Sequence, residues 1–312
     1  GNKMSLLIQV LLLVVGFVML VKGADWFVEG VAGIAEKFGI PQLVIGLTIV
    51  AMGTSAPEAA VSITSAVKGN ADITVGNVVG SNIMNILVIL GLTAVISTLA
   101  VQKSTIRYEI PFMLVVSVIF GLFGMSGEKI DFVEGVIFWA LFIVYLLYLL
   151  VMARKNKEET PEEKSRPVIV LILLGIVGAV LVVWGADVVV DSASAIASYF
   201  GMSERFIGLT IVAFGTSLPE LVTSITAALK KKADIAIGNI VGSNIFNILF
   251  VCGTTALVTP VAFQKNFVID SVVAVGAGIL LWLCVAPKKR LARPAGILML
   301  LCYAGYFAYL IV

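Results

Sequence analysis

Two glutamates, Glu58 and Glu220, lie inside long apolar stretches and are the side chains most able to do chemistry in this sequence. Each ends a copy of the pattern Gly-Thr-Ser-x-Pro-Glu. A charged side chain at the centre of a membrane helix costs about 2.5–3.5 kcal/mol even on the mildest insertion scale. A glutamate at a membrane edge would need no special role, but both lie well inside their apolar stretches. Because ionisable residues at such depth face a cavity or an ion pathway, we interpret the two glutamates as cation ligands.

A proline stands directly before each glutamate and cannot donate the backbone hydrogen bond that a helix needs. The carbonyl four residues earlier is then free, and we expect both helices to be broken there. The residues concerned are Pro57, Pro219, Gly53 and Gly215. Free carbonyl oxygens, together with a threonine hydroxyl one helical turn before each glutamate, are hard ligands that suit Na⁺ or Ca²⁺. Those threonines are Thr54 and Thr216.

A second polar stripe follows in the next apolar stretch of each half. Its members recur at every fourth residue and so share one face of a helix. They are Asn77, Ser81 and Asn85 in the first half and Asn239, Ser243 and Asn247 in the second. These side chains could extend the cation site, or they could form hydrogen bonds between helices, as Asn and Ser often do in membrane bundles. For Asn77 and Asn239 both interpretations stay open.

The composition around these residues is that of a membrane protein. Hydrophobic residues make up 60% of the 312 residues and charged residues 13%, which excludes a soluble globular domain. Histidine is absent, so acid–base chemistry near neutral pH would depend on carboxylates or lysines. The three cysteines lie in apolar runs and are expected to be packing residues. We therefore expect no cofactor, and the net charge of +2 gives no indication of a nucleic-acid partner.

The chain contains an internal repeat at an offset of 162 residues. Gly46–Glu58 reappears as Gly208–Glu220, and Ile73–Asn85 reappears as Ile235–Asn247. Each half holds five apolar stretches long enough to span a bilayer. The predicted fold is therefore an all-α membrane protein of ten transmembrane helices in two five-helix repeats, with helices 2 and 7 broken at the ion site. The predicted spans are 5–37, 41–68, 72–98, 107–126, 130–152, 167–199, 203–229, 234–259, 267–286 and 293–312.

We divide the chain into a first repeat (1–153), a polar linker (154–166) and a second repeat (167–312). Because five is an odd number, the second repeat must enter the membrane from the opposite side, so the repeats are inverted. Most of the 21 Lys and Arg residues lie in connections that follow an odd-numbered span. The exceptions are Lys3, Lys68, Lys129, Arg205 and Lys265. The positive-inside rule assigns the basic side to the cytoplasm and both termini to the outside.

The quoted motifs resemble those of the calcium/cation antiporter family, whose two repeats carry G-T-S-x-P-E and G-N-x-x-G-S-N. The similarity covers essentially the whole chain and is greatest to prokaryotic sodium/calcium exchangers. It implies that Glu58 and Glu220 bind calcium and share sodium, with Thr54 and Thr216 completing the calcium site. It implies flanking sodium sites lined by Ala51, Ser55, Ser81, Ala213, Ser217 and Ser243, with Asn85 at the centre. Some members carry an aspartate where Asn247 stands, so one carboxylate is missing here.

The glutamate pair limits the mechanism, because two facing carboxylates in a low-dielectric interior repel each other. One Ca²⁺, or two or more Na⁺, would neutralise the pair, so the two loads compete and exchange results. We expect an antiporter of Ca²⁺ and Na⁺ in the plasma or inner membrane of a prokaryote, with no enzymatic activity. Calcium/proton exchange on the same pair is the main alternative, and the hydroxyl-rich flanks favour sodium. A channel and an intramembrane hydrolase fit less well, because inverted repeats indicate alternating access and Ser55 has no evident base.

The charge asymmetry predicts that the linker at 154–166 faces the cytoplasm. A cysteine placed at Asn156 in a cysteine-free chain is expected to resist a membrane-impermeant maleimide in intact cells and to react after permeabilisation. Labelling from outside intact cells would reverse the predicted orientation.

Overall fold

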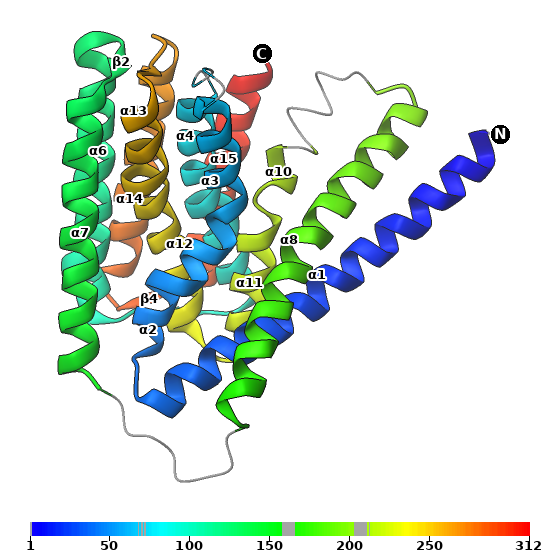
Figure 1. The fold of residues 1–312 in the computed structure, drawn as a ribbon, viewed down its shortest axis with the longest axis horizontal. Helices are drawn as coiled ribbons and strands as arrows, with labels where there is room; N and C mark the ends of the chain where they lie inside the picture. Colours follow the sequence, from blue (N-terminus) through cyan, green and yellow to red (C-terminus); the bar gives the residue numbers. More distant parts are fainter. Residues whose placement is uncertain are drawn as a thin grey trace.

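The computed structural model describes residues 2–67, 69, 71, 73–157, 166–202, 211 and 213–312. Within these ranges the chain is almost entirely helical, with four strands of two residues each. Two long helices, α1 (Asn2–Phe38) and α8 (Val168–Tyr199), lie side by side and cross the remaining helices at a steep angle (Figure 1). The other helices form an upright bundle beside this pair.

Nine helices in the described part of the chain are long and apolar enough to cross a membrane. The tenth predicted span, 203–229, falls partly outside the described residues, and its end is the shorter apolar helix α11 (Leu218–Leu229). The structure therefore confirms the prediction of an all-α membrane protein, with helix ends within a few residues of the predicted ones in the described segments.

The π-helical segments are labelled η. In the first half, α1 is followed by α2 (Gln42–Ile45), η1 (Gly46–Val50), α3 (Ala51–Val67), α4 (Thr74–Met84), η2 (Asn85–Leu90), α5 (Gly91–Ile96), β1 (Leu99–Ala100), η3 (Thr105–Glu109), α6 (Ile110–Gly127), β2 (Lys129–Ile130) and α7 (Phe132–Lys155). In the second half, α8 is followed by α10 (Ala213–Gly215), α11, α12 (Ala233–Phe246), η5 (Asn247–Cys252), α13 (Gly253–Val258), β3 (Val261–Ala262), α14 (Phe267–Val285), β4 (Arg290–Leu291) and α15 (Arg293–Ile311).

The short strands join the two halves at opposite ends of the bundle. β1 pairs with β4, so the connections after the third and ninth spans lie together. β2 pairs with β3, which brings the connections after the fourth and eighth spans together. In Figure 1, β2 lies at one end of the molecule and β4 at the other. Odd-numbered and even-numbered connections thus occupy different ends, as inverted repeats require.

Glycines allow α1 and α8 to approach closely. The two helices run in opposite directions (Figure 1). A Cβ atom added at Gly30 would lie 2.5 Å from the backbone nitrogen of Gly175, and one added at Gly23 would lie 2.9 Å from the carbonyl oxygen of Gly178. Small residues at such crossings let membrane helices pack backbone to backbone.

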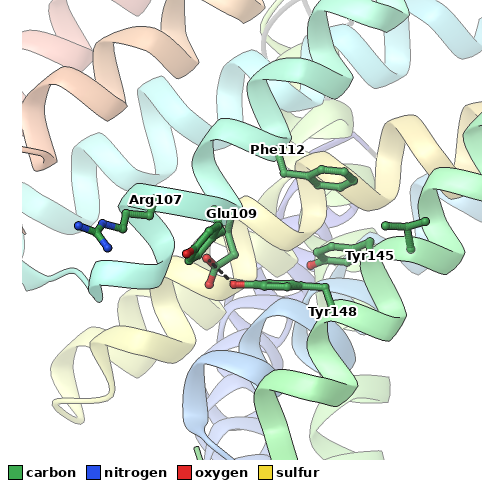
Figure 2. A pocket seen from close by; sticks show the side chains of 7 residues that line it. Arg107, Glu109, Phe112, Tyr145 and Tyr148 are labelled. Atoms are coloured by element: carbon green, nitrogen blue, oxygen red, sulfur yellow. Dashed lines mark hydrogen bonds between the residues drawn. The ribbon is translucent and has the colours of Figure 1, made fainter. Parts of the chain in front are cut away.

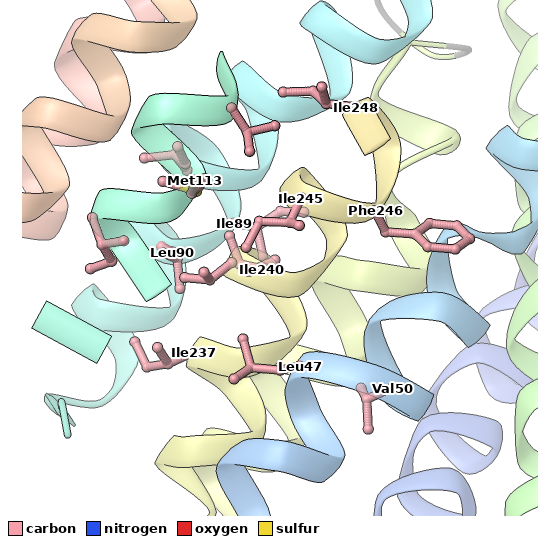
Figure 3. Close-up of a cluster of buried hydrophobic side chains, with 14 of the residues drawn as sticks. Leu47, Val50, Ile89, Leu90, Met113, Ile237, Ile240, Ile245, Phe246 and Ile248 are labelled. Carbon is pink, nitrogen blue, oxygen red and sulfur yellow. The ribbon is translucent and has the colours of Figure 1, made fainter. Parts of the chain in front are cut away.

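The centre of the bundle is built around α12. Every residue from Ile235 to Phe246 is buried. Apolar side chains from η1, η2 and α6 surround it, among them Leu47, Leu90 and Met113 (Figure 3). A Cβ atom at Gly242 would lie 2.7 Å from the carbonyl oxygen of Leu47, so α12 crosses η1 with little room between the backbones. This crossing places the polar stripe of α12 against the start of α3.

The predicted breaks at the two prolines are not both present. In the first half, α3 continues through Pro57 as a single helix, so the expected interruption there was wrong. A proline removes one hydrogen bond from a helix, and here the backbone bridges that loss and stays helical. In the second half, the turn residues Thr216 and Ser217 separate α10 from α11, and Pro219 lies in the first turn of α11, where its missing N–H is not needed.

Candidate cation site

The two glutamates are buried where the repeats meet. Glu58 lies in α3 and is 5% exposed, and Glu220 lies in the first turn of α11 and is 1% exposed. The hydroxyl of Ser55, three residues before Glu58, donates a hydrogen bond of 3.3 Å to Oε1 of Glu220. One turn of α3 therefore contacts the carboxylate of the other half, as the inverted repeat predicted.

Asn77 and Asn239 bind the backbones that carry the glutamates. The amide nitrogen of Asn77 donates to the carbonyl oxygen of Glu58 at 3.4 Å, and that of Asn239 donates to the carbonyl oxygen of Glu220 at 3.2 Å. Each asparagine also donates to a serine hydroxyl one helical turn after its glutamate, at 3.0 Å and 2.9 Å. Of the two interpretations left open by the sequence, the structure supports interhelical hydrogen bonding for both residues.

The same region joins the halves through Thr54. Its hydroxyl lies 2.9 Å from Oδ1 of Asn239 and also contacts the carbonyl oxygen of Val50 at 3.0 Å. Nearby, the hydroxyl of Ser243 donates to the carbonyl oxygen of Ala51 at 3.4 Å. The start of α3 is thus held against α12 by two polar contacts.

Four asparagines, two in α4 and α12 and two at the start of η2 and η5, are joined by four hydrogen bonds between the repeats. The amide nitrogen of Asn82 donates to the carbonyl oxygen of Asn244 at 3.3 Å, and that of Asn244 donates to the carbonyl oxygen of Asn82 at 3.2 Å. The amide nitrogen of Asn85 donates to Oδ1 of Asn244 at 2.9 Å, and that of Asn247 donates to Oδ1 of Asn82 at 3.0 Å. We name these four residues the asparagine ring.

Sequence reasoning missed half of this ring. It selected Asn85 and Asn247 from their helical spacing but passed over Asn82 and Asn244, which lie one residue after Ser81 and Ser243. The signal was present, because both belong to the repeated Gly-Ser-Asn pattern. Their position off the polar stripe hid their role.

Asn85 and Asn247 also begin the π-helical segments η2 and η5. A π turn holds one more residue than an α turn, and such turns occur frequently at functional sites. The two segments occupy equivalent positions in the repeats. The extra residue in each changes the direction of the side chains around it, which the predicted regular helical spacing did not include.

Several buried oxygens at the site have no hydrogen-bond partner among the described residues. They are both carboxylate oxygens of Glu58, Oε2 of Glu220, and Oδ1 of Asn85 and Asn247. All five are atoms that accept hydrogen bonds and, in ionised glutamate or in asparagine, have no proton to donate. The other buried side-chain oxygens without a partner in the described segments are hydroxyls. A buried unpaired acceptor is costly, so this cluster requires a positively charged or hydrogen-donating partner.

The described part of the chain offers no buried positive charge for this purpose. No Lys or Arg side chain in the described ranges is buried, whereas Glu58 and Glu220 both are. The described residues also contain no group of three or more His, Cys, Asp or Glu side chains that could hold a metal ion. Two carboxylates with neutral amide and hydroxyl oxygens are a ligand set that can bind a hard cation.

The structure buries most of the predicted site residues. Those that are buried are Ala51, Thr54, Ser55, Glu58, Ser81, Asn85, Ser217, Glu220, Ser243 and Asn247. Thr216 is exposed, unlike its counterpart Thr54. Ala213 begins α10, and its side chain lies outside the described features. The roles of the individual residues in ion binding stay predictions.

Comparison with known proteins shows the family to which the chain belongs. The sequence profile of the family described as "Sodium/calcium exchanger protein" matches residues 8–151 and 170–312. The chain is 36% identical to "Inner membrane protein YrbG" of Escherichia coli (strain K12), covering 98% of this chain and 96% of the relative. It is 29% identical to "Sodium/calcium exchanger MaX1" of Methanosarcina acetivorans, covering 97% of this chain and 98% of the relative.

A solved structure of the sodium-calcium exchanger NCX_Mj superposes on the chain with a TM-score of 0.85 at 34% sequence identity, covering 98% of this chain and 99% of the other. The family profile, the relatives matched over nearly their whole length and the shared fold all indicate the same family. This chain is a multi-pass integral membrane protein that belongs to the sodium/calcium exchanger family.

Proposed function

We propose that the protein exchanges Ca²⁺ for Na⁺ across the membrane by alternating access, with Glu58 and Glu220 as the central ligands. The observation that supports this most strongly is the buried carboxylate pair without a buried basic residue in the described ranges. One Ca²⁺ would neutralise both carboxylates, and two or more Na⁺ would do the same. Because the same oxygens serve both loads, binding of one displaces the other.

The ligand set favours Ca²⁺ over Mg²⁺. Ca²⁺ takes 6–8 oxygens in flexible geometry, whereas Mg²⁺ requires a tight octahedron and keeps its waters. The site offers carboxylate oxygens from two helices and amide oxygens from Asn85 and Asn247, which come from separate elements. Such a set can supply many oxygens but cannot readily close into a small octahedron.

Sodium is preferred to protons as the counter-ion because hydroxyls surround the pair. Thr54, Ser55 and Ser243 all lie buried beside it, and a hydroxyl oxygen can coordinate Na⁺. Protons would bind to the carboxylates alone, and the surrounding hydroxyls would then have no role in binding the counter-ion. The names of NCX_Mj and MaX1 as sodium-calcium exchangers support the same choice. Calcium/proton exchange on the same glutamates is the alternative that the test below separates.

The long pair α1 and α8 is the element that we propose to move. It contacts the bundle from one side, and its internal packing through glycines makes it a single body (Figure 1). Ion pairs at its surface join Asp25 to Lys230 at 2.6 Å and Glu36 to Lys232 at 2.7 Å. Partly exposed pairs of this kind contribute little stability, so they can break during a transition.

We further propose a location in the inner or plasma membrane of a prokaryote, which the name of YrbG supports. The division into repeats at 1–153 and 167–312, joined by a cytoplasmic linker at 154–166, is part of this proposal. The two segments matched by the family profile agree with that division.

The asparagine ring fixes the direction of two ligand oxygens. A backbone carbonyl can only accept, so the amide nitrogen of Asn82 must face the carbonyl of Asn244. The amide oxygen of Asn82 then points to Asn247 and accepts from its nitrogen, which leaves Oδ1 of Asn247 free. In the other half, Asn244 donates to the carbonyl of Asn82, and its amide oxygen accepts from the nitrogen of Asn85, which leaves Oδ1 of Asn85 free. We infer that Asn82 and Asn244 orient these oxygens toward the transported ion.

Glu58→Gln and Glu220→Gln are each expected to abolish exchange while the protein stays folded, because the load would no longer be matched by two negative charges. The measurement is ⁴⁵Ca²⁺ uptake into proteoliposomes driven either by a sodium gradient or by a proton gradient without sodium. We expect uptake only with sodium. Glu29→Gln, at a partly exposed ion pair with Arg166, is the matched control and should transport normally. Uptake driven equally well by protons would select the alternative, and transport by the Glu58 or Glu220 variants would exclude the paired-glutamate site.

Asn82→Ala and Asn244→Ala are each expected to raise the Ca²⁺ concentration for half-maximal uptake about fivefold, since losing one orienting hydrogen bond costs about 1 kcal/mol. Thr93→Ala is the control, because this buried hydroxyl bonds only to the carbonyl of Ile89 in its own helix. An equal shift in the control would mean that the ring contributes only to packing.

Exchange is expected to be independent of potassium. With Asn85 and Asn247 both uncharged, the two glutamates give the centre a charge that one Ca²⁺ neutralises completely. The test replaces potassium by sorbitol on both sides of the proteoliposomes. Asn247→Asp should slow exchange or create a need for another monovalent ion, because its carboxylate would face Oδ1 of Asn82, which now accepts a hydrogen bond from Asn247 at 3.0 Å. A strong loss of flux from the unmutated protein without potassium would contradict this charge count.

A further inference from the structure

A cavity of about 260 Å³ lies between η3, the start of α6 and the second half of α7, and neither Glu58 nor Glu220 lines it (Figure 2). Most of its wall is aromatic. The lining residues are Arg107, Tyr108, Glu109, Phe112, Val144, Tyr145 and Tyr148. The cation site described above includes none of them.

The aromatic rings form two pairs. Phe112 and Tyr145 are stacked, with ring centroids 5.8 Å apart and an interplanar angle of 3°. Tyr108 and Tyr148 are tilted at 54°, with centroids 6.1 Å apart. The cavity therefore meets aromatic rings from three elements, η3, α6 and α7.

A buried carboxylate lies behind this aromatic wall. Glu109 is 1% exposed. The hydroxyl of Ser104 donates to its Oε1 at 3.1 Å, and the hydroxyl of Tyr148 donates to its Oε2 at 3.2 Å (Figure 2). Among the described residues no Lys or Arg forms an ion pair with Glu109, and the guanidinium of Arg107 points away from it in Figure 2.

We propose that this cavity binds a compact alkylammonium cation, with the aromatic rings holding the ammonium group and Glu109 supplying the opposite charge. Cations are attracted to the faces of aromatic rings, and aromatic cages recognise quaternary ammonium groups in this way. The negative charge of Glu109 acts strongly across an apolar wall because little water screens it. The small size of the cavity, near the lower limit of ligand pockets, selects a compact ligand.

The same contacts argue against a metal ion in this cavity. Both oxygens of Glu109 already accept hydrogen bonds, and the rest of the wall offers few oxygens. Ca²⁺ would need 6–8 oxygen ligands. A quaternary ammonium needs no hydrogen bonds and loses little on leaving water, so it suits a wall of rings.

Tyr145 connects this cavity to the cation site. Its hydroxyl donates a hydrogen bond of 2.9 Å to the carbonyl oxygen of Leu47 in η1, the segment that leads directly into α3 with Ser55 and Glu58. A cation seated on the ring of Tyr145 would favour the arrangement in which this bond is formed. Bound ligand should therefore slow exchange, and this second part of the inference rests on the proposed function.

The binding test uses the full chain in lipid nanodiscs and compares choline with 3,3-dimethylbutan-1-ol, its uncharged isostere of the same shape. Saturation-transfer NMR should show saturable choline binding at least tenfold tighter than binding of the isostere. Glu109→Gln should reduce choline binding to the level of the isostere. Phe112→Leu, which keeps an apolar side chain but removes a ring face, should weaken it several-fold, and Glu29→Gln should leave it unchanged. Equal binding of the two compounds, or choline binding unaffected by both cavity variants, would overturn the site.

The coupling test measures sodium-driven ⁴⁵Ca²⁺ uptake with saturating choline. We expect choline to slow uptake by the unmutated protein and to have little effect on Tyr145→Phe, which keeps the ring but loses the bond to Leu47. The isostere should have no effect on either protein. Unchanged uptake in the presence of bound choline would overturn the coupling. Because binding is measured without transport, a failure of the proposed exchange function would leave the binding result intact.

Discussion

The structure depends on one electrostatic constraint, which is the burial of two carboxylates without a buried cation of the protein's own in the described ranges. Desolvation and mutual repulsion both disfavour Glu58 and Glu220 as an empty ionised pair. The charge of such a pair must be matched by protons or by bound cations, and the proposed exchange requires that these arrive and leave. The requirement for a mobile charge links the fold to transport, because a conformational change with the pair unmatched is costly and a change with a cation load is not.

The neutral groups around the pair set what that mobile charge can be. The side-chain nitrogens of Asn82 and Asn244 bind backbone carbonyls, which can only accept, and this fixes the orientation of both amides. Their amide oxygens then accept hydrogen bonds from Asn247 and Asn85 and orient those amides in turn. Amide groups could otherwise turn either a donor or an acceptor toward the centre. In the proposed site the ring presents the acceptor in both halves, which suits a cation and would repel an anion. Gly238 and Gly242 permit the close crossing of α12 with η1, the segment that leads into α3.

The fold and the presence of buried glutamates could be predicted from the sequence because both follow from simple rules. Span length, the 162-residue repeat and the burial cost of Glu58 and Glu220 need no knowledge of packing. The predicted break at Pro57 was wrong, because α3 is continuous there. A proline weakens a helix, but tertiary contacts decide whether the helix breaks. The π segments at Asn85 and Asn247, the ring partners Asn82 and Asn244, and the bond from Tyr145 to Leu47 all depend on contacts between distant segments. The repeated Gly-Ser-Asn pattern marks Asn82 and Asn244, but no local pattern shows which groups these features contact.

The difference between the halves is itself informative, because the repeated motifs are nearly identical in sequence. Thr54 is buried in a continuous helix, whereas Thr216 is exposed in a turn between α10 and α11. Alternating access in inverted repeats requires a second conformation in which the two halves exchange these environments. We propose that the asymmetry seen here corresponds to one of the two conformations. In the proposed mechanism the load at Glu58 and Glu220 stays at the boundary between the halves, and the exchange of environments around it decides from which side the ion can leave.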